Sequence, residues 1–184
     1  MAPENWHRGD YLVSTDPDLL QVDAINAALG SEMVWWAGDL PAAALQEALH
    51  SSLCLGLYQK APMETPNGAR SSSTSNGVEH SATDNTPAAL KQIGLVRVIT
   101  DNVTFAYLTD VYILDGHRGS GLGRWVLEIL NEKLRSWPHL RRVMLLTTDK
   151  MHLFSRNLGM KDYREFDGMK GVSIAMVEGP GAQH

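Results

Sequence analysis

Between Arg118 and Arg124 the sequence reads RGSGLGR, so glycine stands at every second position between two arginines. Ordered glycine costs backbone entropy, and a cluster of glycines indicates a main chain that another group must approach closely. Apolar residues at helical spacing begin at Leu122, and the N-terminus of such a helix presents unpaired N–H groups. Together these features predict a loop that binds a phosphate group.

Two common phosphate-binding patterns do not fit this loop. A dinucleotide fingerprint G-x-G-x-x-G that starts at Gly119 needs a sixth-position glycine, where Arg124 stands. A P-loop needs Lys followed by Ser or Thr after its last glycine, and Gly123 is followed by Arg124. The pattern that remains is Arg118-x-x-Gly121-x-Gly123.

The distribution of charge supports a small anionic ligand. The net charge of −5 argues against nucleic acid as a general partner. Residues 117–142 hold six Lys and Arg against two Glu, which is +4 locally and leaves −9 for the rest. This basic zone coincides with the glycine run and fits a small phosphate-rich ligand better than a long polyanion, although a solvated basic helix face has the same composition.

The remaining composition is that of one globular domain. The chain has 184 residues, of which 43% are hydrophobic and 20% charged. It shows neither a signal peptide nor a membrane-spanning stretch, so we expect a cytoplasmic or nuclear protein that contacts no membrane. The single cysteine, Cys54, lies in an apolar run and is predicted to be a buried, unreactive thiol.

Apolar periodicity and turn residues predict the elements that position the loop. We expect strands over 11–15, 53–58, 93–101, 105–114 and 141–148, and a final hairpin of 163–166 with 172–177. We expect helices over 15–29, 39–51, 122–137 and 150–159. A polar segment at about 61–89 has almost no large apolar residue and is predicted to be a long loop inserted between two adjacent strands.

The pattern Arg118-x-x-Gly121-x-Gly123, after the strand LTDVYIL and before a short helix ending in NLGM, resembles the pyrophosphate-binding region of the GNAT N-acetyltransferases. The segments FAYLTDVYILDGHRGSGLG and LCLGLY with GLVRVITD resemble one subgroup of small GNAT proteins. The resemblance implies an α+β fold and a single domain over 1–184. It implies a mixed, mostly antiparallel sheet of six to seven strands, a splayed central parallel pair and about four flanking helices.

The resemblance also implies acetyl-CoA as co-substrate and no metal. Backbone amides would hold its pyrophosphate, and the residues concerned are Arg118, Gly119, Ser120, Gly121, Leu122, Gly123 and Arg124. Backbone groups at Val111 and Ile113 would bond the pantetheine arm and polarise the acetyl carbonyl. The acceptor would be a primary amine of a small molecule or peptide. The alternative is an acyl-CoA-binding or sensor protein of the same fold with little or no catalysis.

The acceptor-side residues are less clearly marked by the sequence. Asp110 is a candidate base, and the alternative is a structural carboxylate that accepts backbone N–H bonds at a sheet irregularity. Tyr107 would orient the substrate. Ser155 stands where many family members have a tyrosine that protonates the leaving thiolate. Trp35 and Trp36 would line an acceptor pocket or serve as core anchors, and a homodimer through the C-terminal hairpin is possible.

Overall fold

A six-stranded mixed sheet runs through the part of the chain that the computed structural model describes, residues 2–34, 36–60, 89–166, 171, 173–175 and 177. The strands lie side by side in chain order. They are β1 (Asn5–Arg8), β2 (Tyr11–Ser14), β3 (Leu53–Lys60), β4 (Leu90–Thr100), β5 (Phe105–Ile113) and β6 (Arg142–Leu145). Neighbours from β1 to β5 are antiparallel, and β5 and β6 are parallel. The predicted α+β fold with one parallel pair is confirmed.

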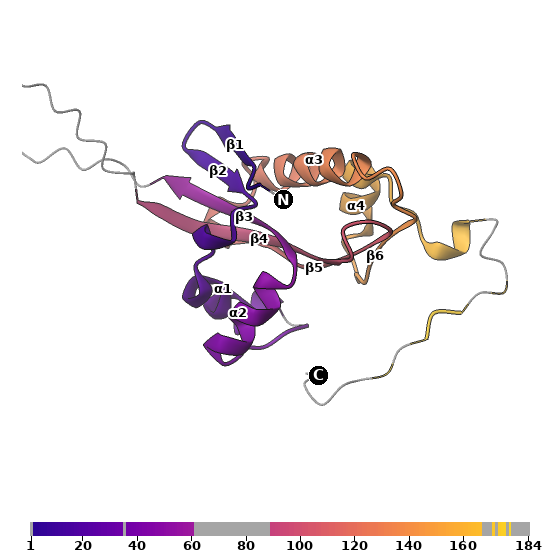
Figure 1. The fold of residues 1–184 in the computed structure, drawn as a ribbon, viewed down its shortest axis with the longest axis horizontal. Coiled ribbons are helices and arrows are strands. Elements are labelled where there is room, and N and C mark those ends of the chain that lie inside the picture. The colour runs from indigo at the N-terminus through magenta and orange to yellow at the C-terminus, as the bar shows by residue number, and fades with distance from the viewer. Residues whose placement is uncertain are drawn as a thin grey trace, which may run out of the picture.

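Helices cover both faces of the sheet (Figure 1). One face carries α1 (Val22–Leu29) and α2 (Ala42–His50), and the other carries α3 (Leu122–Arg135) and α4 (Met151–Leu158). We call these the α1–α2 face and the α3 face. Consecutive residues of a strand point to opposite faces, so Leu95 packs in the core of the α1–α2 face while Val96 packs in the core of the α3 face.

The helix α3 follows the predicted apolar stripe. Val126, Leu130 and Leu134 recur at four-residue spacing and are all buried in the α3 face. Trp137 is buried just beyond the helix, which ends before Pro138 because proline cannot continue the hydrogen-bonded ladder. This helix therefore packs along its length against the sheet, which fixes the position of its first turn relative to the end of β5.

The predicted helix over 15–29 is wrong at its start. A 3-10 turn occupies Pro17–Leu19, where Asp16 accepts a hydrogen bond from the Asp18 backbone, and α1 begins only at Val22. The interruption has a tertiary cause. Gln21 donates from its backbone N–H to the side chain of Gln92 at 2.8 Å, which ties this turn to β4.

The ends of the chain also differ from the prediction. The strand β1 was not predicted at all, and β6 has four residues where eight were expected. Tyr163–Glu165 forms a 3-10 turn with a capping box from Asp162, so the first arm of the predicted C-terminal hairpin is wrong. Of the second arm, the described residues 173–175 and 177 lie in no strand.

Two expectations fall on residues outside the described ranges. These are the polar segment, of which 61–88 lies outside, and the side chain of Trp35. Among the described helices, none has the length and apolar character that a membrane span requires.

Candidate active site

The glycine run connects the end of β5 to the first turn of α3. Gly119 and Gly121 adopt φ of +83° and +78°, the left-handed region that side chains other than Asn and Asp rarely enter. A Cβ built on Gly119 would meet nothing within 4 Å, so the loop is open on that side. The third glycine, Gly123, faces the sheet, where its Cβ position lies 3.5 Å from Ile113 Cδ1.

The backbone amides of this loop have no partners of their own. Gly121 is the N-cap of α3 and offers no side chain to the first turn. The first backbone N–H to be satisfied is that of Trp125, which donates to the Gly121 carbonyl at 3.1 Å. From Gly119 to Arg124 no backbone N–H donates to any acceptor in the described part of the chain. Consecutive free donors at a helix N-terminus form an anion-binding cradle.

The two arginines that flank the glycines are engaged elsewhere. Arg118 donates from Nε to the Ile113 carbonyl at 2.9 Å and pairs with Asp115. Arg124 pairs with Glu128 at 2.7 Å, one turn along α3. The Arg118 side chain thus closes the loop onto the end of β5, and the Ile113 carbonyl, one of the backbone groups expected to be free, is already occupied.

A third arginine reaches the loop from a part of the chain that the sequence reading missed. Arg8, at the end of β1, donates from Nη1 to the Gly121 carbonyl at 3.4 Å. Its guanidinium also lies over the Trp125 ring, 5.9 Å from the ring centre. The signal that marks β1 is the Gly-Asp pair after Arg8, which makes a two-residue hairpin turn with the predicted strand that follows.

The parallel pair separates next to this loop. Pairing between β5 and β6 runs from Phe105 with Arg142 to Leu108 with Leu145 and stops there. The strand β5 continues to Ile113, and no further β6 residue lies beside it. The edge of β5 from residue 109 to residue 113 is therefore unpaired by β6 and leads directly to the glycine run. The splayed parallel pair that the family resemblance implied has its opening at this point.

A β-bulge in β5 sets which side chains face the opening. Two steps along β4, from Leu95 to Arg97, lie opposite three steps along β5, from Tyr112 to Thr109. The extra residue reverses the alternation of the strand. Before it Leu108 packs in the α3 face, and after it Tyr112 packs in the α1–α2 face.

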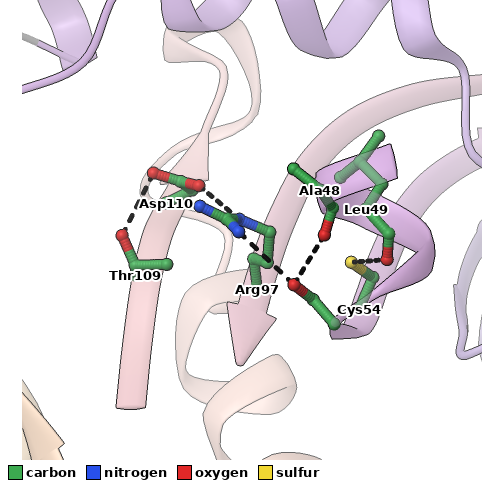
Figure 2. A network of polar contacts seen from close by, with 7 residues as sticks. Ala48, Leu49, Cys54, Arg97, Thr109 and Asp110 are labelled. Atoms are coloured by element: carbon green, nitrogen blue, oxygen red, sulfur yellow. Dashed lines mark hydrogen bonds and ion pairs between the residues drawn. The ribbon is translucent and has the colours of Figure 1, made fainter. Parts of the chain in front are cut away.

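Asp110 is the residue at this bulge (Figure 2). Its φ of +48° is left-handed, which aspartate tolerates better than most residues. Its buried carboxylate accepts from Arg97 Nε at 2.6 Å and from the Thr109 hydroxyl at 3.2 Å. Arg97 in turn donates to the Ser52 hydroxyl at 3.3 Å. The structural expectation for Asp110 was a carboxylate at a sheet irregularity that accepts backbone N–H bonds. The structure has the carboxylate at such an irregularity, but its donors are the side chains of Arg97 and Thr109.

Tyr107 lies on the same strand before the bulge, opposite Ile99 of β4 and Met144 of β6. It is partly buried, and burial raises its pKa above the ordinary tyrosine value, with the charge of Asp110 acting in the same direction. The phenol is therefore protonated at neutral pH and is a hydrogen-bond donor rather than a base.

The other predicted site residues are more exposed. Ser155 lies on an exposed side of α4, and its carbonyl accepts the N–H of Gly159, which ends the helix in the left-handed conformation. Trp36 lies between α1 and α2 with 42% of its surface exposed, so it is not a buried core anchor. Among the described residues no group of three or more His, Cys, Asp or Glu could hold a metal ion.

Comparison with known proteins identifies this arrangement. The family model described as "Acetyltransferase (GNAT) family" matches residues 77–160. A protein of Gibberella zeae, "Putative acetyltransferase FG08082", is 71% identical over 182 residues, which cover 99% of this chain and 97% of that protein. The chain belongs to the GNAT acetyltransferase family.

Solved structures agree with this assignment. A GNAT-family protein of Xanthomonas campestris pv. campestris is 29% identical in sequence and has a TM-score of 0.59. The match covers 91% of this GNAT chain and 93% of the Xanthomonas chain. A protein of methicillin-resistant Staphylococcus aureus is 15% identical over 92% and 98% of the two chains, with a TM-score of 0.57. The second similarity shows the shared fold.

The residues of this GNAT protein fit coenzyme A at the loop. A pyrophosphate needs several donors on one concave backbone, and the free N–H groups of residues 119–124 are such donors. The left-handed Gly119 and Gly121 bring those donors to one side without a Cβ in the way. Sequence reasoning found this loop and missed Arg8, which approaches it from the other end of the chain.

Proposed function

We propose that this protein is an acetyl-CoA-dependent N-acetyltransferase whose acceptor is a primary amine of a small molecule or a peptide. One observation carries the proposal: the unsatisfied backbone donors of residues 119–124 adjoin the stretch of β5 that β6 leaves unpaired. The donors suit a pyrophosphate, and the open strand edge suits an extended amide-containing arm. Bound acetyl-CoA would supply an acetyl thioester.

The backbone would do most of the work at this thioester. The amides from Gly119 to Arg124 would hold the phosphates and fix the position of the whole co-substrate, whereas the Arg118 amide, also expected to do so, already donates to the Asp115 carbonyl at 3.2 Å. Backbone N–H groups at Val111 and Ile113, on the unpaired edge of β5, would bond the arm and the acetyl oxygen. Negative charge develops on that oxygen when an amine attacks, so a fixed N–H donor lowers the barrier.

Side chains of the α1–α2 face would handle the amine. Tyr107, a protonated phenol, would donate a hydrogen bond to the acceptor. For Asp110 we propose two roles that one variant separates: acceptor of the amine proton, and anchor of the bulge through Arg97. Trp36 would border the acceptor, and Ser155 of α4, on the α3 face, would donate to the leaving sulfur.

Turnover with a panel of amines tests the activity. The panel includes a polyamine, free amino acids, an arylalkylamine and a peptide with a free N-terminus, each with acetyl-CoA and a thiol-detecting reagent. One class is expected to accelerate thiol release above the amine-free rate. Cys54 adds no background signal because burial raises its pKa to about 12, so its thiol stays protonated. Binding of acetyl-CoA without acceleration by any amine contradicts the enzymatic proposal.

That negative result is the signature of the second candidate, an acyl-CoA-binding or sensor protein. The observation that favours it is the absence of a phenol at position 155 of α4, where an exposed serine stands. A serine hydroxyl is a much weaker acid than a phenol and gives a leaving thiolate little help.

A further inference from the structure

We propose that Arg8 is a coenzyme A-binding residue whose guanidinium contacts a phosphate group at the N-terminus of α3. The inference rests on the proposed function, because it adds a side chain to that co-substrate site. It brings the hairpin of β1 and β2, a part of the chain more than a hundred residues away from the glycines, into the binding surface.

The first step is where Arg8 lies. Its Nη1 is 3.4 Å from the Gly121 carbonyl, and a Cβ built on Gly121 would lie 3.7 Å from Nη2. Gly121 is in the middle of the run of unsatisfied amides from Gly119 to Arg124. The guanidinium therefore lies within contact distance of the cradle itself.

The second step is how many donors Arg8 has left. A guanidinium carries five N–H donors in a rigid fork. The interactions of Arg8 in the described part of the chain are the single bond to the Gly121 carbonyl and the contact with the Trp125 ring. The ring contact keeps the guanidinium beside the first turn of α3, and the remaining donors are available to phosphate oxygens, which accept such forks in a bidentate manner.

The third step is charge. Arg118 and Arg124, the arginines that flank the glycines, are each paired with a carboxylate, Asp115 and Glu128 respectively. Arg8 has no carboxylate within 4.0 Å among the described residues. It is therefore the arginine at this loop whose positive charge is not already balanced, and a phosphate is the group that would balance it.

The fourth step is that the hairpin holds Arg8 in place. Arg8 and Tyr11 are opposite each other across the turn, and the rings of Tyr11 and His117 form a T-shaped pair with their centres 6.5 Å apart. The turn is also tied to the sheet, because Lys60 donates its backbone N–H to the Asp10 carbonyl at 2.8 Å. A cation held on a fixed hairpin loses less entropy on binding than one on a free terminus.

The test compares Arg8→Gln with the parent protein and with Arg135→Gln, a matched change at an exposed arginine at the far end of α3. Dissociation constants are measured for coenzyme A, 3′-dephospho-coenzyme A and pantetheine at two salt concentrations. Arg8→Gln is expected to weaken coenzyme A by roughly five- to tenfold and to leave pantetheine unchanged. Its affinity for coenzyme A should also fall less steeply with salt than that of the parent.

The three ligands identify the phosphate. Equal losses for coenzyme A and its dephospho form place Arg8 on the pyrophosphate, and a loss confined to coenzyme A places it on the 3′-phosphate. Thermal unfolding is measured first, and Arg8→Met, which keeps the apolar stem on Trp125, replaces the glutamine variant if that variant unfolds.

Two results overturn the proposal in distinguishable ways. In the first, the parent binds coenzyme A and Arg8→Gln binds it within twofold of the parent's affinity and with the same salt dependence. This result would show that Arg8 does not contact the ligand. A folded parent that binds no coenzyme A removes the site itself. A loss of affinity with an unchanged salt dependence also counts against a phosphate contact, because it indicates that Arg8 only supports the loop.

Discussion

At the scale of single residues, Asp110 holds the bulge of β5 through Arg97 and is also the proposed acceptor of the amine proton. Its carboxylate is held by Arg97 and Thr109, and its backbone occupies the left-handed region at the bulge. Asparagine tolerates the same backbone conformation and keeps one oxygen acceptor, so Asp110→Asn removes the charge without changing the bulge. The variant therefore separates the charge from the conformation.

Asp110→Asn is expected to lower kcat more than it weakens acetyl-CoA binding. It should also cost about 1–3 kcal/mol in the free energy of unfolding, because the partly buried Arg97 loses its carboxylate. The measurements are steady-state kinetics, acetyl-CoA titration and denaturant unfolding. The control is the double variant Arg97→Met with Asp110→Asn, in which no unpaired charge remains.

Recovery of both stability and turnover in that double variant would assign Asp110 to positioning alone. Recovery of stability without turnover would support its role as the proton acceptor. An Asp110→Asn protein with the parent's kcat would exclude the role of Asp110 as proton acceptor.

At the scale of elements, β1 is attached to α3 at both of its ends. Glu4, just before the strand, pairs with Lys133 at 3.0 Å, and Arg8, its last residue, reaches the start of the helix. Lys133 has only 7% of its side chain exposed, so the ammonium group depends on this partner. The strand thus runs alongside the helix that carries the glycine loop.

Glu4→Gln is expected to lower the free energy of unfolding by about 1 kcal/mol, because it leaves a buried ammonium without its counter-charge, while the exposure of Glu4 limits the loss. Denaturant unfolding measures the change. Glu132→Gln, at an exposed glutamate of α3 next to Lys133, is the matched control and should be neutral.

Adding Lys133→Met to Glu4→Gln should restore most of the lost stability, since an apolar side chain of similar length needs no counter-charge. Equal stability of the parent and Glu4→Gln would mean that the pair contributes nothing to the attachment of β1.

The elements also show how far the sequence could be read. The helix α3 and the loop before it were predictable, because their signals are local: an apolar stripe, glycines and a terminating proline. The short strand β1 carries no apolar alternation, since three of its four residues are exposed, and it is held by pairing with β2 and by the contacts of its ends. The start of α1 was likewise set by a distant side chain, Gln92.

The same reasoning applies to the site. The phosphate loop was readable because glycine spacing reports backbone conformation. The partner of Asp110 was not, because the pairing of Arg97 with it depends on a bulge that only strand register reveals. The contact between Arg8 and Gly121 was not predictable either, because no residue near Arg8 in the sequence indicates which distant segment it contacts.

At the scale of the whole molecule, ligand binding and folding are linked. A co-substrate that binds only the folded protein stabilises it by RT ln(1 + [L]/Kd), about 2.7 kcal/mol at a hundredfold excess over Kd. Acetyl-CoA is therefore expected to raise the Tm of the parent.

In Gly121→Val the increase should be absent. The valine side chain would stand at the cradle beside Arg8, and its positive φ should cost about 1–2 kcal/mol of stability by itself. Gly159→Val is the matched control, because Gly159 also has a positive φ, +67°, and a Cβ there meets nothing within 4 Å. A Gly121→Val protein that gains as much Tm from acetyl-CoA as the parent would show that the co-substrate does not use this loop.

The bulge in β5 has a consequence for comparing this chain with its relatives. One extra residue at Asp110 divides the strand into two halves of opposite parity: even-numbered side chains lie on the α3 face before it, and odd-numbered ones after it. A relative with one residue fewer at this point would have an unbroken alternation and would keep the same faces, with the equivalent of Tyr112 in the core of the α1–α2 face and that of Val111 on the α3 face. The position of a single-residue gap within β5 in an alignment therefore decides which residues of a relative are assigned to each face of the sheet. A gap at Asp110 can be checked by whether the two cores keep their apolar residues.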